Sequence, residues 1–104
     1  MSTAPKTGFA DVFRPEAMAC NLQVRTRDEA LAELIRLLEK DTPGLDPQIM
    51  LRDLVAREEL APTVVHPGIA VPHLRLDGVS RLLLAVGTSV SGIAFNGDPD
   101  HLVH

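Results

Sequence analysis

The chain has 104 residues, of which 45% are apolar and 23% charged, and its formal net charge is −4. This length and composition predict one globular domain with an ordinary apolar core. The acidic balance and the absence of tryptophan and tyrosine argue against nucleic-acid binding, which needs a positive face and, for single strands, stacking surfaces.

Three further features indicate where in the cell the protein is located. The single cysteine, Cys20, excludes an internal disulfide and fits a reducing, cytoplasmic location. Residues 1–8 lack the apolar stretch of a secretory signal, so we expect a flexible N-terminal tail there and one domain over residues 9–104. No apolar run approaches the roughly 20 residues of a membrane-spanning helix, so we expect no direct membrane insertion.

The first elements predicted along the chain are a strand and a helix. Alternate apolar residues predict a strand over Met18–Val24, with Cys20 as a small buried side chain. Thr26 followed by Glu29 has the form of a capping box. Leucine and isoleucine at helical spacing then predict an amphipathic helix from about Arg27 to Lys40.

A second helix is predicted to follow. Asp46 has the character of an N-cap and Pro47 that of a first helical residue. The last turn carries Arg57, which suits a helix C-terminus, and Glu58 and Glu59, whose charges oppose the helix dipole. The apolar stripe of this helix consists of Met50, Leu51, Leu54 and Val55.

The second half of the chain predicts short strands joined by turns. Thr63–Val65 and Ile69–Val71 are two extended pieces around a turn at His66-Pro67-Gly68. The apolar run Leu82–Val86 predicts a strand covered on both faces. A further strand would start at Leu102, so we expect the chain to be truncated at the C-terminus. The element order predicts an α/β fold with a mixed β-sheet flanked by helices.

Among these elements, His73 has the strongest case for chemistry. Pro72 fixes the backbone before it, and a neutral imidazole nitrogen is a nucleophile. Arg57 could bind phosphate through two parallel hydrogen bonds, and Arg75 is a second candidate for that role. Thr63 could donate a hydroxyl hydrogen bond to the imidazole or to a phosphate. These groups describe a phosphohistidine carrier, while a packing or surface role for His73 and a solvated one for Arg57 stay open.

Other chemistries are less well supported. His101 and His104 have a spacing that can chelate a metal, and His66 and His73 could meet in space, but no cysteine or acidic pair completes a zinc site. Gly-rich phosphate loops and the Gly-x-Ser-x-Gly motif of hydrolases do not occur. We therefore expect neither a metal nor a cofactor.

Four segments carry a family resemblance: Arg57-Glu58, Pro62-Thr63, Gly68-Ile-Ala-Val-Pro-His73 and Ser91-Gly-Ile-Ala-Phe95. Together they resemble the type-2 EIIA domain of the bacterial phosphoenolpyruvate-dependent sugar phosphotransferase system (PTS), the fructose, mannitol and nitrogen-regulatory class. The third segment is the most specific. The resemblance implies an α/β fold with a mixed sheet, of which this chain would be the N-terminal two-thirds or so.

The resemblance also implies a reaction, a phosphoryl transfer that needs no metal. His73 would accept the group from the phosphohistidine carrier HPr or its nitrogen-branch counterpart, and Arg57 would contact it. In sugar systems the group would pass to a cysteine of an EIIB component; a transporter or a regulatory target is the other expected partner. The family has a second histidine beyond the strand that starts at Leu102, and we assign that role to neither His101 nor His104.

Two positions depart from the usual family pattern. Pro62-Thr63 stands where Ser-Thr is usual, and Leu74 follows His73 where many sugar-specific members have glycine. Pro62 removes one hydroxyl, and the Pro-His-Leu-Arg form resembles regulatory or transporter-linked members. Both departures also motivate an alternative, a non-catalytic sensor or interaction module with a ligand in the His73 cleft, and a purely structural domain is a third interpretation. If strands of the sheet are missing, its uncovered apolar edge would favour self-association.

Overall fold

Two N-capped helices form one layer of the fold. The computed structural model describes residues 15–42, 44–73 and 83–104. Helix α2 spans Arg27–Asp41, and the predicted capping box is present at its start. The Thr26 hydroxyl accepts the backbone N–H of Glu29 at 3.1 Å, and the Glu29 carboxylate accepts the backbone N–H of Thr26 at 3.1 Å. The predicted helix is therefore confirmed to within one residue at its end.

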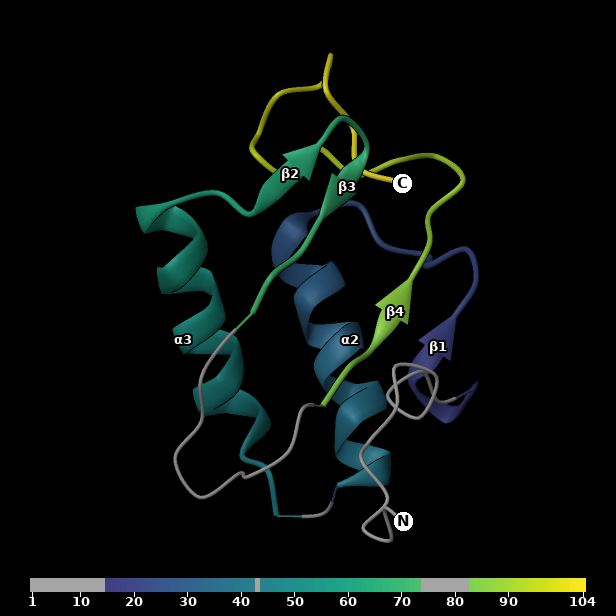
Figure 1. Cartoon of the computed structure of the whole chain (residues 1–104), viewed down its shortest axis with the longest axis vertical. Helices are drawn as coiled ribbons and strands as arrows, with labels where there is room; N and C mark the ends of the chain where they lie inside the picture. The colour runs from purple at the N-terminus through teal and green to yellow at the C-terminus, as the bar shows by residue number, and fades with distance from the viewer. Residues whose placement is uncertain (1–14, 43, 74–82) are drawn as a thin grey trace, which may run out of the picture.

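Helix α3 spans Pro47–Leu60 and packs beside α2 (Figure 1). One carboxylate oxygen of Asp46 accepts the backbone N–H groups of Gln48 at 3.1 Å and Ile49 at 3.2 Å, which confirms the predicted N-cap. Among the described residues, no helix is long and apolar enough to cross a membrane.

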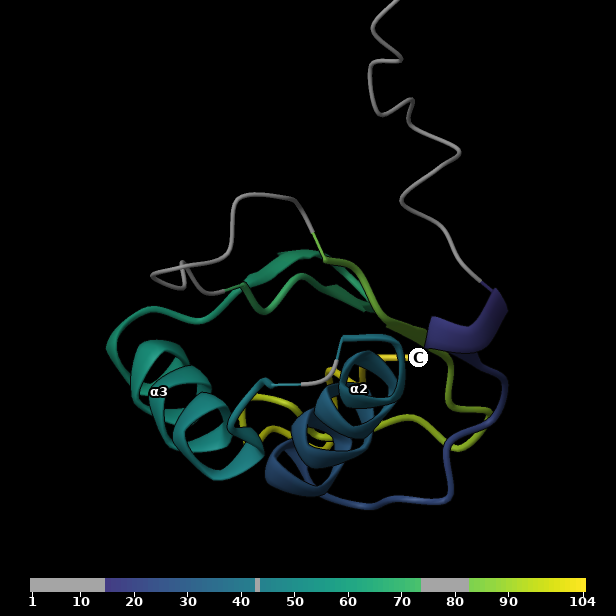
Figure 2. The same ribbon diagram turned by 90° about the horizontal axis from the view of Figure 1, so that it is seen from below.

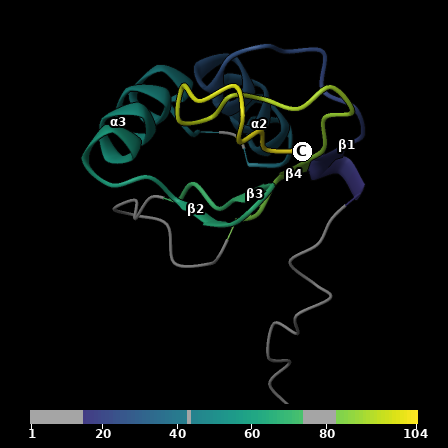
Figure 3. The same ribbon diagram turned by 90° about the horizontal axis from the view of Figure 1, so that it is seen from above.

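The strands form a second layer that faces the helices (Figures 2 and 3). After a 3-10 turn, η1 (Pro15–Ala17), strand β1 (Met18–Ala19) pairs in parallel with β4 (Val86–Gly87). Strand β2 (Val64–His66) pairs in the antiparallel sense with β3 (Ile69–Ala70). The α/β class is thus confirmed, and both strand directions occur, as two separate two-stranded pairs within the described part of the chain.

The β2–β3 hairpin forms where the sequence predicts it. Gly68 has a φ of +86°, in the left-handed region that glycine adopts without steric cost, and Pro67 precedes it in the turn. The pairing extends beyond the strands, because the backbone N–H of Val71 donates to the Thr63 carbonyl at 2.9 Å. The segment that leads to His73 is therefore tied to the segment that leaves α3.

The core lies between the two helices and the segment around residue 94. Within the described part of the chain, the buried residues of this cluster are Ala30, Leu31, Ile35, Met50, Leu54, Ile93 and Phe95. Leu51 and Val55 pack against them as half-buried side chains, so the predicted stripe of α3 is confirmed as its inner face. Ile93 and Val103 exchange two backbone hydrogen bonds of 2.8 Å each, which holds the last residues of the chain against this core.

The strand predicted over Met18–Val24 is too long, and its predicted inward side is wrong at Met18 and Cys20, which are exposed. Strand β1 ends at Ala19, and Asn21 has a φ of +54°, a left-handed conformation that asparagine tolerates better than most residues. The alternation of inward and outward side chains breaks there. Cys20 is consequently exposed rather than buried, while Leu22, on the other side of the break, is half-buried.

The apolar run near β4 is also less covered than expected. Residues 83–86 are half-buried, and only Val86–Gly87 forms a strand, because the parallel pairing with β1 extends over two residues on each side. A Cβ atom added at Gly87 would lie 2.6 Å from Leu22 Cδ1 and 3.1 Å from Leu34 Cδ2. The missing side chain therefore lets two leucines pack directly on the backbone of β4.

Candidate functional site

A buried carboxylate joins the end of α3 to the start of the hairpin. Glu58 is 3% exposed and Thr63 is 5% exposed. The Thr63 backbone N–H donates to Glu58 Oε2 at 3.0 Å, and the Thr63 hydroxyl donates to Glu58 Oε1. Burying a carboxylate is costly unless such donors replace water. The two bonds from one residue therefore both satisfy the carboxylate and close the intervening turn.

Sequence reasoning missed this role of Glu58, which we expected only as a charge opposing the dipole of α3. The structure shows why the position is tolerated, since the carboxylate is directed to donors on the following segment. A signal was present in the sequence. An acidic residue in the last turn of a helix needs a local donor, and Thr63 follows five residues later, just after the Pro62 that prevents the helix from continuing.

His73 is exposed and lies shortly after β3. Its Nδ1 atom is 2.9 Å from the carbonyl oxygen of Val71. Because a carbonyl can only accept, this contact assigns the ring proton to Nδ1 and leaves the lone pair of the neutral ring on Nε2. Val71 is in turn bonded to the Thr63 carbonyl, so a continuous series of hydrogen-bonded residues runs from Glu58 through Thr63 and Val71 to His73.

Arg57 lies in the last turn of α3, directly before Glu58, and is half-buried. Its Nη1 donates to the carbonyl oxygen of Ala61 at 3.0 Å, while the Ala61 backbone N–H donates to the Arg57 carbonyl at 3.1 Å. A guanidinium holds five N–H donors in one rigid plane, so a bond at one nitrogen orients the whole group. The cation and the buried carboxylate are thus presented by the same helical turn.

The structure brings some predicted site residues together and leaves others apart. Thr63 is connected to His73 through Val71, but its hydroxyl hydrogen is directed to Glu58. Arg75 and Leu74 lie outside the described residues, as does the N-terminal tail predicted at residues 1–8.

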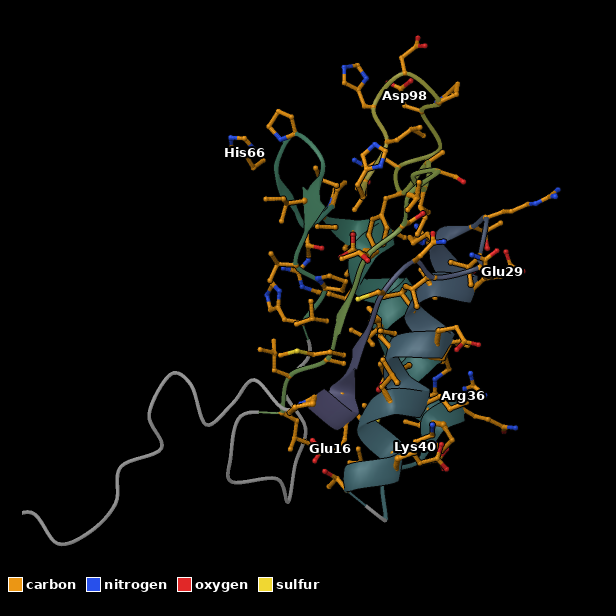
Figure 4. All side chains as sticks on the ribbon, turned by 90° about the vertical axis from the view of Figure 1, so that its right-hand side faces the viewer. Glu16, Glu29, Arg36, Lys40, His66 and Asp98 are labelled. Carbon is orange, nitrogen blue, oxygen red and sulfur yellow. The ribbon has the colours of Figure 1, made fainter. Side chains whose placement is uncertain are left out.

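The other three histidines line a different region. A cavity of about 710 Å³ between the hairpin turn and the C-terminal segment has His66, His101 and His104 in its wall and does not include His73. His66 lies at the outer end of the hairpin, near the turn that carries Asp98 (Figure 4). Two hydrogen bonds lower the pKa of the Asp98 carboxyl. The larger effect comes from the backbone N–H of Asp100, and the smaller from the His101 ring, whose Nδ1 lies 2.6 Å from Asp98 Oδ2.

Comparison with known proteins decides the family. The family model for the phosphoenolpyruvate-dependent sugar phosphotransferase system, EIIA 2, matches residues 11–104. The chain belongs to this family. The resemblance seen in the sequence is therefore confirmed, and this EIIA chain is a member of a family of phosphotransferase components.

Relatives of this EIIA chain carry the name nitrogen regulatory protein. The one from Pseudomonas aeruginosa is 32% identical over 75 residues, which cover 72% of this chain and 49% of the relative. The one from Pseudomonas putida is 33% identical over 75 residues, covering 72% and 84%. The one from Bradyrhizobium diazoefficiens is 31% identical over 74 residues, covering 71% and 48%. The matched part spans about half the length of the first and third relatives.

Proposed function

We propose that this EIIA chain is a phosphohistidine carrier with a regulatory role, and that Nε2 of His73 accepts a phosphoryl group from an HPr-like phosphocarrier protein. The contact of 2.9 Å between His73 Nδ1 and the Val71 carbonyl carries the proposal. Because a carbonyl can only accept, this contact supports a neutral ring with its proton on Nδ1 and with Nε2 as the nucleophilic atom. The exposure of His73 supports transfer from another protein, whose phosphohistidine must come within bonding distance.

In the proposed transfer, one N–P bond forms as another breaks, and no metal or cofactor is needed. Nε2 attacks the phosphorus atom in line with the N–P bond of the donor; that bond breaks as the new one forms, and the donor ring recovers its lone pair. The His73 ring gains positive charge as the N–P bond forms. The Val71 carbonyl stabilises that charge because it accepts the Nδ1 hydrogen throughout the step.

The remaining predicted residues act on the transferring group or on its surroundings. Arg57 binds the phosphoryl oxygens through its guanidinium plane, which Ala61 holds in a fixed direction. Arg75, two residues after His73, is a second contact for the anion. Thr63 supports the site from its buried side, through its carbonyl bond to Val71.

The names of the relatives favour regulation over sugar uptake as the purpose of the transfer. In that role the phosphorylation state of His73 is the signal, and the recipient is a regulatory target or a transporter rather than a sugar-specific EIIB component. The chain acts in the cytoplasm beside its donor.

The test is phosphorylation of the intact protein with phosphoenolpyruvate, Enzyme I and HPr or its nitrogen-branch counterpart. We expect acid-labile phosphate on the wild type and on His66→Ala, and none on His73→Ala. His66 is the matched control because it is an exposed histidine of the same hairpin. Unlabelled wild type, or equal labelling of His73→Ala, would refute the proposal. Unlabelled wild type that is stabilised by a small metabolite would instead support the non-catalytic sensor.

A further inference from the structure

Glu58 is a buried carboxylate whose two oxygens accept hydrogen bonds from Thr63. We infer that Glu58 is a positioning residue for phosphoryl transfer: its carboxylate holds the strand segment that orients His73 in register with the helical turn that presents Arg57. This inference rests on the proposed function. Glu58 would affect the reaction only through the residues that it holds in position, without touching the phosphoryl group.

Glu58 fixes the path of the turn after α3. Pro62 has no backbone N–H, and the Ala61 N–H still belongs to the helix, since it donates to the Arg57 carbonyl. Thr63 is the first residue beyond Pro62 with a backbone donor, and Glu58 takes that donor together with the hydroxyl. Two bonds to one residue fix its orientation as well as its distance, so the carboxylate determines where the chain enters the hairpin.

Thr63 is connected to the reacting ring through Val71. The carbonyl of Thr63 accepts the backbone N–H of Val71 at 2.9 Å, and the carbonyl of Val71 lies 2.9 Å from His73 Nδ1. A displacement of Thr63 therefore displaces the carbonyl that sets the tautomer and direction of the His73 ring.

Glu58 is also connected to the cationic side chain of Arg57. Arg57 precedes Glu58 in the same helical turn, and its guanidinium is bonded to Ala61, within the turn that Glu58 closes. One carboxylate therefore anchors the two segments that carry the nucleophile and the arginine. Catalysis by positioning is sensitive to such anchors, because a shift of about 1 Å can slow a transfer about 100-fold.

The experiment compares Glu58→Gln with Glu59→Gln in the intact protein. Both variants remove one negative charge from adjacent positions of α3, but the Glu59 side chain is 65% exposed, and its contact with Arg27 is 3.7 Å long. Glutamine at position 58 is uncharged and places an NH₂ group where the second carboxylate oxygen was, so the two Thr63 donors no longer have a separate acceptor oxygen each. Two readouts are needed: the phosphorylation rate constant at saturating donor, separated from KM, and the proton–nitrogen NMR correlations of the His73 ring without phosphorylation.

We expect Glu58→Gln to lower the rate constant about 10- to 100-fold with KM changed less than about 3-fold, and to shift the His73 ring signals away from the pure Nδ1–H tautomer. Glu59→Gln should match the wild type in both. If Glu58→Gln does not fold, Thr63→Ser and Thr63→Val replace it: serine keeps the hydroxyl and should restore the rate and ring signals that valine loses.

The outcomes separate this inference from the proposed function. Wild type that accepts no phosphate would refute the function, whereas the ring signals test the positioning independently of any donor. The inference would be overturned if Glu58→Gln had the same ring signals and rate constant as Glu59→Gln. It would also be overturned if Thr63→Val matched Thr63→Ser in both readouts.

Discussion

Replacing Thr63 with valine isolates the bond between its hydroxyl and the buried Glu58 carboxylate. The substitution nearly preserves the shape of the side chain and leaves the backbone N–H of Thr63 donating to Oε2 at 3.0 Å. Glu58 is 3% exposed, so water cannot freely replace the lost donor on Oε1. A hydrogen bond to a charged group contributes about 1.5–3 kcal/mol, and we expect a loss of about 2 kcal/mol in the free energy of unfolding.

The assay is urea unfolding followed by circular dichroism, which suits a chain that has neither tryptophan nor tyrosine. Thr88→Val is the matched control, since the Thr88 hydroxyl accepts the Asn21 backbone N–H at 2.9 Å at an exposed position. We expect that variant to lose no more than about 1 kcal/mol. In a domain of this size, 2 kcal/mol corresponds to a fall of roughly 10 °C in Tm.

A double-mutant cycle with Glu58→Gln completes the test. If the two side chains stabilise the protein through each other, the double variant should lose less than the sum of the single losses, by about 1 kcal/mol or more. Thr63→Val that is no more destabilising than Thr88→Val, or a cycle with strictly additive losses, would refute the assignment of a strong buried bond.

Three further predictions concern other parts of the chain. Arg57→Ala should slow phosphorylation about 100-fold or more in transfer kinetics, and Arg57→Lys should have an intermediate rate. Both variants should change the free energy of unfolding in urea by less than about 0.5 kcal/mol. Phosphorylation rates equal to that of the wild type would contradict the role of the guanidinium. Gly92→Ala should destabilise more than Gly68→Ala in the same unfolding assay, by about 1–3 kcal/mol, because both have positive φ but only at Gly92 would a Cβ come within 2.9 Å of neighbouring side-chain atoms. Backbone N–H groups of residues 25 and 26 lower the pKa of Glu29 below its usual 4.5, so the ionised carboxylate stabilises the fold above pH 4.5, and this stabilisation is lost as the pH falls through the lower pKa of the folded state. The difference in the free energy of unfolding between wild type and Glu29→Gln should therefore shrink over that pH range. A difference that does not change with pH would contradict the role of Glu29.

The elements that the sequence predicted well are those with local causes. Thr26 and Glu29 cap α2 from positions three residues apart, and Asp46 caps α3 through the backbone N–H groups of the second and third residues after it. The turn at Pro67-Gly68 likewise depends on residues inside it. Such signals are complete within a short window, so no tertiary information was needed to interpret them.

The features that the sequence did not predict depend on distant partners or on a single backbone angle. The left-handed conformation of Asn21 is accompanied by a hydrogen bond in which its side-chain Oδ1 accepts the backbone N–H of Val90, 69 positions away. This conformation changes which residues of the first predicted strand face outward. The burial of Glu58 depends on the path of the chain after Pro62. The motif around His73 could still indicate the family, because the order of residue types is visible in the sequence even when their contacts are not.

The pairing of β1 with β4 has a consequence for the order in which the protein folds. The bond between Asn21 and Thr88 beside this pair joins residues 67 positions apart, and both helices and the hairpin lie between them. Closing so long a loop costs chain entropy before the contact returns any stabilisation, so pairings of this kind form late. During synthesis, α2 and α3 can pack as soon as they leave the ribosome, whereas β1 must wait with its edge unpaired until Val86 and Gly87 emerge. Variants that weaken the packing of Leu22 on Gly87 should therefore act mainly on a late step of folding.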